Sequence, residues 1–273
     1  MVNVYIDRRF RKMNNFKQKY GPWALVTGAS SGIGSEFAKQ LAAKSLNLIL
    51  VARREDRLNT LAADLKKEYS IETRVVPADL SKEDFLPDIK SSISDLEVGI
   101  LINNAGFTKT GPLVENTLED ELKLLHVNCR APLILAHEYG RQMKERQKGG
   151  MIFLASTVAF AAVSSWTNYC ASKAYDLMLA EGLAVELKKY GVDVLALCPG
   201  FTRTEFIELP KITNAMAMDV EPVVKLALKK LGKTRFTVPG LFNKFATFST
   251  RWQPRALNSF IYKQVINPAQ HFN

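Results

Sequence analysis

The chain has 273 residues, of which 47% are hydrophobic and 23% charged, a balance that indicates a globular protein and excludes wholesale disorder. No apolar run approaches the ~18 residues that a membrane-spanning helix needs, and no apolar stretch follows the basic N-terminus to make a secretory signal. Cys129, Cys170 and Cys198 lie far apart, which excludes a zinc-ligand spacing or a disulfide framework and favours a reduced, cytoplasmic setting.

The net charge of +10 is concentrated at the two ends of the chain. Residues 1–19 hold six Lys or Arg and one Asp, and residues 222–273 hold nine Lys or Arg and no acid, so the segment between them is net negative. Basic ends attract phosphate-bearing ligands or an anionic membrane surface, although a solvated surface accounts for most such runs. No recognition motif accompanies the charge, which argues against nucleic acid as a partner.

Short runs rich in Val, Ile and Leu predict β-strands, each followed by polar residues, Gly or Pro. They cover residues 24–27, 46–51, 74–76, 99–102, 151–155 and 192–197, with a further candidate at 234–238. These runs lack the alternating polarity of half-exposed strands, which indicates that the strands are buried on both faces.

Longer amphipathic stretches between the strands predict helices. They cover residues 33–43 and 56–69, a segment opened by a capping box at 81–84, residues 118 into the 141–148 region, 166–190 with a stop at Gly191, and 221–231. Strands that alternate with helices predict a doubly wound, Rossmann-like α/β fold, a parallel sheet with helices on both faces. Residues 211–218 are expected to form a loop or short helix, and the basic, aromatic residues 241–266 a helical tail.

Three glycines follow the first predicted strand and lead into the first predicted helix. Gly28, Gly32 and Gly34 let the backbone turn tightly there, and the helix N-terminus favours the negative charge of a nucleotide pyrophosphate. The spacing G-x-x-x-G-x-G departs from the generic dinucleotide fingerprint. An ordinary glycine-rich turn is the alternative, and the strand and helix on either side weigh against it.

Arg53 and Arg54 follow the second strand, where a site for NAD usually places a carboxylate for the ribose hydroxyl. A guanidinium suits the 2′-phosphate of NADP, so Arg53 favours NADP(H) over NAD(H), although a surface arginine that opens the next helix is the alternative. Asp79, beside Leu80, is a candidate for binding the adenine or for accepting turn N–H groups.

Tyr169 and Lys173 stand four residues apart in a predicted helix and therefore on one face. A neighbouring ammonium favours phenolate, which predicts a lowered pKa for Tyr169 and suits acid-base chemistry. Ser156 lies thirteen residues before Tyr169, just past the fifth strand, where its hydroxyl is placed to orient a carbonyl. The Tyr-Lys spacing alone is commonplace, and a half-buried Tyr beside a solvated Lys explains it as well.

Taken together, these motifs resemble the short-chain dehydrogenase/reductase family, in the branch with the glycine motif TGxxxGxG. The resemblance spans residues 23–204 in family order, and its matches are Thr27, Gly28, Gly32, Gly34, the run 103–106, Ser156, Tyr169, Lys173, Pro199, Gly200 and Thr204. It implies that Tyr169 exchanges a proton with the substrate oxygen, that Lys173 lowers its pKa and holds the nicotinamide ribose, and that Ser156 polarises the carbonyl.

The resemblance implies two further roles. Asn128 corresponds to an asparagine that distorts its helix and anchors a proton-relay water, and Thr202 and Thr204 to residues that meet the nicotinamide carboxamide. The residues expected to bind the cofactor are Gly28, Ser30, Ser31, Gly32, Ile33, Gly34, Arg53, Asp79, Leu80, Asn104, Ala105, Gly106, Tyr169, Lys173, Pro199, Gly200, Thr202 and Thr204, and no metal is expected.

The sequence departs from the family pattern after the candidate serine. Thr157 takes the place of Ser156 if the register shifts by one residue, and Phe160 replaces a small residue and is expected to narrow the site. Apolar residues after Pro199 hint at a lipophilic substrate such as a 3-oxoacyl group, a steroid-like ketone or a hydrophobic aldehyde, with ordinary packing as the alternative.

The expected organisation is a basic extension at residues 1–22, an NADP-binding catalytic domain at 23–240 with a substrate loop at about 201–220, and a basic aromatic tail at 241–273. The expected function is NADP(H)-dependent carbonyl reduction. A non-catalytic nucleotide-binding scaffold is the alternative, against which the complete Ser156, Tyr169 and Lys173 set argues. The resemblance implies a homodimer or homotetramer, and the tail suggests peripheral membrane contact.

Overall fold

The structure, a computed structural model, describes residues 15–205 and 217–266. Its centre is a seven-stranded sheet in the order β3-β2-β1-β4-β5-β6-β7, in which neighbouring strands pair in parallel. The strands are β1 (Trp23–Thr27), β2 (Asn47–Ala52), β3 (Thr73–Pro77), β4 (Val98–Asn103), β5 (Gly149–Leu154), β6 (Val192–Leu197) and β7 (Phe236–Thr237). The seven predicted strands are therefore confirmed, with ends that differ by at most two residues.

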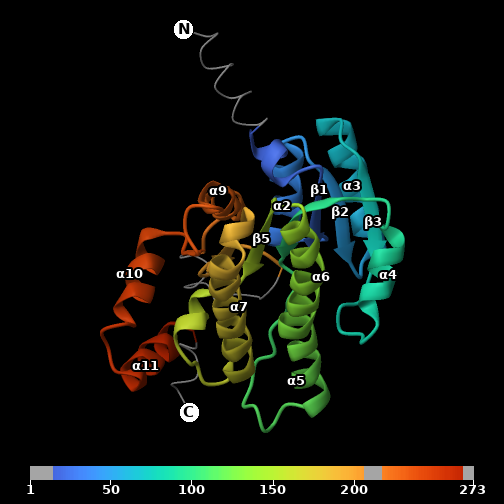
Figure 1. Ribbon diagram of the computed structural model, residues 1–273. Coiled ribbons are helices and arrows are strands. Elements are labelled where there is room, and N and C mark those ends of the chain that lie inside the picture. The colour runs from blue at the N-terminus through green and yellow to red at the C-terminus, as the bar shows by residue number, and fades with distance from the viewer. Residues whose placement is uncertain (1–14, 206–216, 267–273) are drawn as a thin grey trace.

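Helices cover both faces of this sheet (Figure 1). Their bounds are α2 (Gly32–Ala42), α3 (Glu55–Tyr69), α4 (Phe85–Ser92), α5 (Leu118–Leu125), α6 (Ala131–Glu145), α7 (Thr167–Glu186), α9 (Val220–Lys230), α10 (Leu241–Ser249) and α11 (Arg255–Ile266). Alternate strand residues point to opposite faces, so Leu25 packs with α4, α6 and α7, while Val26 packs with α2, α3 and α9. The predicted doubly wound fold is confirmed.

The strand order reverses between β1 and β4, since β2 and β3 extend the sheet on one side of β1 and the later strands extend it on the other. In doubly wound sheets, ligands bind beyond the carboxyl ends of the strands at such a reversal. The glycine turn after β1 and the run Asn104 to Gly106 after β4 meet there.

The long helix predicted from residue 118 contains a π-helical turn at His126–Arg130, which joins α5 to α6 without a break. The following long helix also ends as predicted: α7 is followed by a 3₁₀ turn at Lys188–Tyr190 and then by Gly191 in the left-handed region. These two long helical segments lie side by side on one face of the sheet (Figure 1).

The predicted capping box at residues 81–84 is wrong. The N–H and hydroxyl of Ser81 donate to Asp79 Oδ1 at 3.0 and 2.8 Å, so Ser81 closes a turn with the preceding aspartate. Helix α4 begins only at Phe85, and Asp84 caps it without a side-chain hydrogen bond. The local turn therefore outcompetes the cap.

The C-terminal tail is helical as predicted, with α10 and α11 lying to one side of the body (Figure 1). Most of the segment expected at residues 211–218 lies outside the described residues. At its described end, Met218 pairs with the strand-like residues after β6, because its N–H donates to Phe201 O at 2.9 Å. Across residues 15–205 and 217–266, no helix is long and apolar enough to span a bilayer.

Candidate active site

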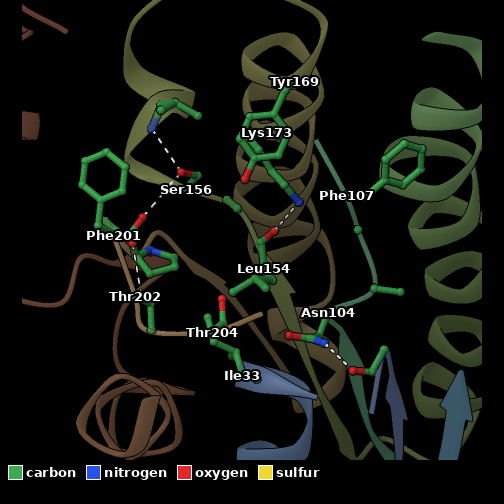
Figure 2. A pocket seen from close by; sticks show the side chains of 18 of the residues that line it. Ile33, Asn104, Phe107, Leu154, Ser156, Tyr169, Lys173, Phe201, Thr202 and Thr204 are labelled. Atoms are coloured by element: carbon green, nitrogen blue, oxygen red, sulfur yellow. Dashed lines mark hydrogen bonds between the residues drawn. The ribbon is translucent and has the colours of Figure 1, made fainter. Parts of the chain in front are cut away.

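A single cavity of about 810 Å³ brings most of the predicted residues together at the carboxyl edge of the sheet. Every residue expected to bind the cofactor lines this cavity except Gly34, and so does Ser156. Figure 2 shows Ser156, Tyr169 and Lys173 with Asn104 and Thr204 around the same space. The volume lies within the range of pockets that bind small molecules.

Close backbone approach explains the glycines of the turn. Gly28 has a φ of +65°, and a Cβ there would lie 2.8 Å from Asn104 Nδ2. A Cβ on Gly34 would lie 2.2 Å from Gly28 O, a distance that no side chain adopts. Gly34 therefore allows α2 to pack closely against the glycine turn, although Gly34 itself does not line the cavity.

Thr27 ties this turn to the end of β4. Its Oγ1 accepts the N–H groups of Asn104 and Ala105 at 3.0 Å each, and Asn104 Nδ2 donates to Thr27 O at 2.9 Å. The two loops that frame the cavity are thereby held as one unit.

Arg54, which the sequence prediction left out in favour of Arg53, also lines the cavity. The Arg54 guanidinium donates to the hydroxyls of Ser30 and Ser31 at 3.0 Å each, and it contacts the Glu205 carboxylate at 3.5 Å. Arg53 also lines the cavity. The signal for Arg54 was its place directly after Arg53, but the sequence did not show which of the two guanidinium groups meets the serines.

Asp79 follows β3 at the carboxyl edge of the sheet. Its burial raises the pKa of the carboxyl, but hydrogen bonds from Ser81 and the charge of Arg53 outweigh that effect and leave the pKa lowered. Asp79 is thus a carboxylate that already accepts from its own turn, the alternative that the sequence left open. Because it also lines the cavity, the adenine role stays a prediction.

Helix α7 presents Tyr169 and Lys173 to the cavity, with exposed fractions of 7% and 3%. Lys173 Nζ donates to Leu154 O at 2.7 Å and lies 5.9 Å from the centroid of the Tyr169 ring. Ser156, just after β5, is hydrogen-bonded to Tyr169. Of the two hydroxyls that the sequence proposed, Ser156 is therefore the one in contact with the phenol, while Thr157 begins a 3₁₀ turn.

The expected lowering of the Tyr169 pKa is wrong for this arrangement. Burial raises the pKa of the phenol, and this effect exceeds the lowering by the Lys173 ammonium and by Ser156. For Lys173, burial lowers the pKa, but the neighbouring Asp176 carboxylate and the phenol outweigh it and leave the pKa raised. Tyr169 is thus a protonated phenol beside a charged ammonium at neutral pH.

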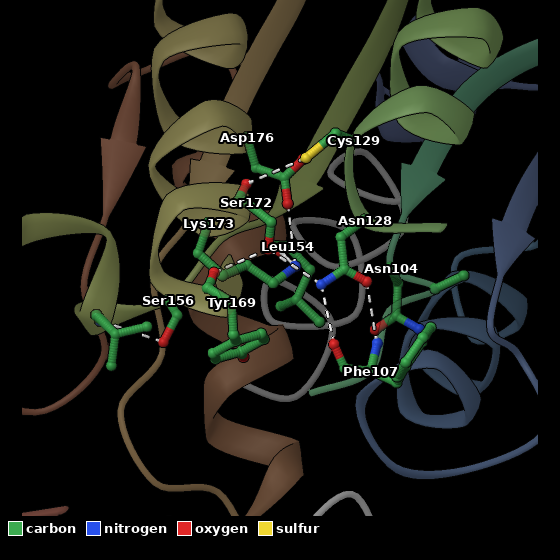
Figure 3. A network of polar contacts seen from close by, with 12 residues as sticks. Asn104, Phe107, Asn128, Cys129, Leu154, Ser156, Tyr169, Ser172, Lys173 and Asp176 are labelled. Atoms are coloured by element: carbon green, nitrogen blue, oxygen red, sulfur yellow. Dashed lines mark hydrogen bonds and ion pairs between the residues drawn. The ribbon is translucent and has the colours of Figure 1, made fainter. Parts of the chain in front are cut away.

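Asn128 lies behind the site in the π-helical turn, with an exposed fraction of 0%. Its Nδ2 donates to Phe107 O at 2.9 Å and to Ser172 Oγ at 3.1 Å, and its Oδ1 accepts from the Phe107 N–H at 3.1 Å (Figure 3). Asn128 therefore joins the loop after β4 to α7. The helix is distorted at this residue as expected, whereas its part in a proton relay stays a prediction.

One wall of the cavity is apolar and aromatic. It is lined by Phe107, Val158, Trp166, Phe201, Met218, Leu241, Phe242, Ala246, Ile261 and Tyr262. The residues from α10 and α11 were missed, because irregular spacing in the tail does not indicate which side chains face inward. Phe160 was expected to narrow the site, but it packs against the core and Phe236, with ring centroids 5.9 Å apart, and does not line the cavity.

Among the described residues, no group of three or more His, Cys, Asp or Glu is placed to hold a metal ion.

Comparison with known proteins identifies the family to which the chain belongs. The family model "short chain dehydrogenase" matches residues 22–211. The chain is 31% identical to the 7beta-hydroxysteroid dehydrogenase of Collinsella aerofaciens over 84% of its own length and 90% of that protein. It is 29% identical to the very-long-chain 3-oxoacyl-CoA reductase of Mus musculus over 86% of its length and 77% of that protein.

A solved structure shares both the fold and the sequence pattern. The short-chain dehydrogenase of Sphingobium yanoikuyae, in complex with NADPH, has a TM-score of 0.75 and 33% identity, with coverage of 90% of this chain and 95% of that one. The chain belongs to the short-chain dehydrogenase family and is an oxidoreductase that interconverts alcohol and carbonyl groups.

Proposed function

We propose that this enzyme reduces a bulky, hydrophobic ketone or aldehyde with NADPH. The observation that carries the proposal is the pairing of Ser156, Tyr169 and Lys173 with an aromatic wall across one cavity of about 810 Å³. Polar groups that act on a carbonyl oxygen thus meet a surface that holds an apolar substrate.

The residues of this chain supply the proton and orient the carbonyl. Tyr169 keeps its proton through the neutral range, since burial raises the pKa of the phenol, and it donates that proton to the substrate oxygen. Ser156 donates a second hydrogen bond to the same oxygen, and the Lys173 ammonium stabilises the phenolate that remains. When bound, the nicotinamide supplies the hydride. The protonated phenol is the form that the reductive direction requires.

The cavity fits a phosphorylated dinucleotide at its glycine end. Gly28 and Gly32 leave room for the backbone to approach a pyrophosphate, since a Cβ on Gly32 would lie 3.0 Å from Thr204. Arg54, Ser30 and Ser31 would hold a 2′-phosphate, because together they offer a guanidinium and two hydroxyls. The NADPH complex of a relative that is 33% identical supports this preference.

The substrate class follows from the chemistry of the apolar, aromatic wall of the cavity. Trp166, Phe201, Phe242 and Tyr262 line it from different elements, which suits a large apolar body such as a steroid nucleus or a fatty chain. Relatives named as a hydroxysteroid dehydrogenase and a 3-oxoacyl-CoA reductase support both members of that class. A non-catalytic scaffold is not favoured, since it requires neither Tyr169 nor Lys173.

Association is part of the proposal. The long helices beside the site expose Leu118, Leu122, Leu133, Met178 and Val185, an apolar surface that suits pairing of two or more copies of this chain.

We further propose that the tail contacts an anionic membrane surface from the cytoplasmic side. Helix α10 exposes Phe245 and Phe248, and the loop between α10 and α11 exposes Trp252, next to basic residues.

A panel of ketones tests the activity. NADPH oxidation by the purified protein is measured with a 3-oxosteroid, a 7-oxosteroid, a long-chain 3-oxoacyl thioester, an aryl ketone and, as the polar control, a keto sugar. The proposal predicts turnover of at least one bulky apolar ketone and none of the sugar. Absence of turnover with the whole panel, while NADPH still binds, would instead favour the nucleotide-binding scaffold.

A further inference from the structure

Asp176 is a buried carboxylate that lies next to the candidate lysine. It follows Lys173 by three residues on α7, so the two side chains share one face of the helix. Asp176 Oδ2 is 3.0 Å from Lys173 Nζ, and each side chain is only 4% exposed (Figure 3). A carboxylate this deeply buried is costly unless it is paired, and Lys173 is its partner.

The second oxygen of this carboxylate is left without a partner. Across residues 15–205 and 217–266, Asp176 Oδ1 is buried and forms no hydrogen bond. A half-satisfied buried ion pair contributes little to stability, and apolar residues of similar volume often replace such pairs without loss. Stability of the fold alone therefore does not account for an acid at this position.

The groups around Asp176 come from several elements. They are Tyr169 and Tyr175 on α7, Cys129 in the π-helical turn and Cys198 after β6. Burial raises the pKa of the Cys129 thiol to about 11 and raises that of Cys198 as well, so both thiols are neutral. Lys173 is thus the cation that Asp176 contacts among the described residues.

Two acceptors fix the direction of the ammonium. One N–H of Lys173 points to Leu154 O at 2.7 Å and another to Asp176 Oδ2 at 3.0 Å. A lysine ammonium has three N–H donors on a flexible stem, so these two bonds leave the third for the cavity that Lys173 lines. Loss of either acceptor would free the stem to adopt other rotamers.

We propose that Asp176 is a positioning residue, which aims the Lys173 ammonium into the site and adds a negative charge that keeps the proton on Tyr169. This inference rests on the proposed role of Tyr169 as proton donor. The negative charge of Asp176 raises the pKa of the phenol, in the same direction as its burial. Asp176 thus limits how far the ammonium favours phenolate.

The decisive variant is Asp176→Asn, which keeps the shape and removes the charge. Without that charge the Tyr169 phenol loses its proton more easily, so the alkaline limb of kcat/KM for ketone reduction moves to lower pH by about one unit. At pH 7 we expect kcat to fall about tenfold through loss of ammonium orientation, while KM for NADPH changes less than about threefold. The matched control is Glu181→Gln on the same helix, which makes the same charge change and leaves the limb in place.

A direct titration separates this inference from the proposed activity. Phenolate absorbance is measured against pH in wild type and in Asp176→Asn. The curve of the same protein with Tyr169→Phe is subtracted from each, which isolates the Tyr169 phenolate. This measurement requires no turnover. A lower midpoint in Asp176→Asn supports the inference even if no ketone in the panel is a substrate. Equal midpoints, or an equal shift in Glu181→Gln, overturn it. If Asp176→Asn does not fold, Asp176→Glu serves: it keeps the charge, so it should retain the wild-type midpoint, and a midpoint lowered by about one unit overturns the inference.

Discussion

Two adjacent arginines at the carboxyl end of β2 face different surroundings. Arg54 donates to the Ser30 and Ser31 hydroxyls, whereas Arg53 lies near enough to Asp79 to lower the pKa of its carboxyl. Because both line the cavity, either guanidinium is placed to meet the 2′-phosphate in the proposed NADPH complex. The serine contacts favour Arg54.

Replacement of Arg54 by Ala is therefore expected to raise KM for NADPH about tenfold, a loss of ~1.4 kcal/mol, and to change KM for NADH less than twofold. Steady-state kinetics with both cofactors measures this. Arg57→Ala is the matched control, since Arg57 pairs with the same Glu205 at 2.6 Å but does not line the cavity. An equal loss with NADPH and NADH would show that Arg54 does not read the 2′-phosphate.

At the residue scale, the sequence predicted which side chains meet but not their electrostatics. Tyr169 and Lys173 share a helical face by their spacing alone, and Ser156 reaches them because it lies two residues after the end of β5. The direction of the phenol pKa could not be predicted, since it depends on burial by residues distant in sequence. Phe160 was misplaced for the same reason, because Phe236 holds it in the core.

At the scale of elements, the approach of α2 to the glycine turn is the most demanding contact. A Cβ on Gly34 would lie 2.2 Å from Gly28 O and 2.5 Å from Asn104 Nδ2, and the first of these is backbone that cannot rotate away. We expect Gly34→Ala to lower the free energy of unfolding by about 1–3 kcal/mol and to weaken NADPH binding.

Denaturant unfolding and fluorescence titration of NADPH measure the two effects. Gly182→Ala is the matched control, because an added Cβ there meets nothing within 4 Å. As an exposed glycine within α7, Gly182 should gain about 0.5–1 kcal/mol of stability on the same substitution. If Gly34→Ala has the wild-type free energy of unfolding and the wild-type affinity for NADPH, the close approach of α2 to the turn does not require glycine at this position.

Element positions were predictable where the chain repeats a simple pattern. Apolar runs predicted the buried strands, and Gly191 predicted where the long helical segment ends. The π-helical turn at Asn128 was expected only from the family resemblance, because the three hydrogen bonds of Asn128 reach other elements and follow no local sequence pattern. The contribution of α10 and α11 to the cavity is likewise a tertiary contact that the tail sequence does not encode locally.

At the scale of the whole molecule, basic side chains and exposed apolar side chains lie together on α10, α11 and the loop between them. Phe245 and Trp252 are 73% and 80% exposed, and Lys244, Arg251 and Arg255 lie among them with no acid from residue 222 onward. Leu241, Phe242 and Ile261 are exposed and also line the cavity, so this face is continuous with the apolar wall of the site. Aromatic and basic residues together suit the surface of an anionic bilayer.

Sedimentation with vesicles containing phosphatidylserine tests this surface. We expect binding at 50 mM salt that weakens at 500 mM, and loss of binding in the combined variant Phe245→Ser, Phe248→Ser and Trp252→Ser. The control Leu118→Ser, Leu122→Ser removes exposed apolar residues from α5 and should bind as wild type does. Failure of wild type to sediment at 50 mM salt would contradict membrane contact, and loss of self-association in the triple variant would assign the face to a second copy of the chain.

Tyr169→Phe tests the central claim most directly, with NADPH-dependent reduction of a bulky ketone measured beside the dissociation constant for NADPH. The account predicts that kcat falls by at least about a hundredfold, because the proton donor is lost, while the dissociation constant changes less than about threefold. Ketone reduction at the wild-type rate by Tyr169→Phe would contradict the assignment of Tyr169 as the proton donor.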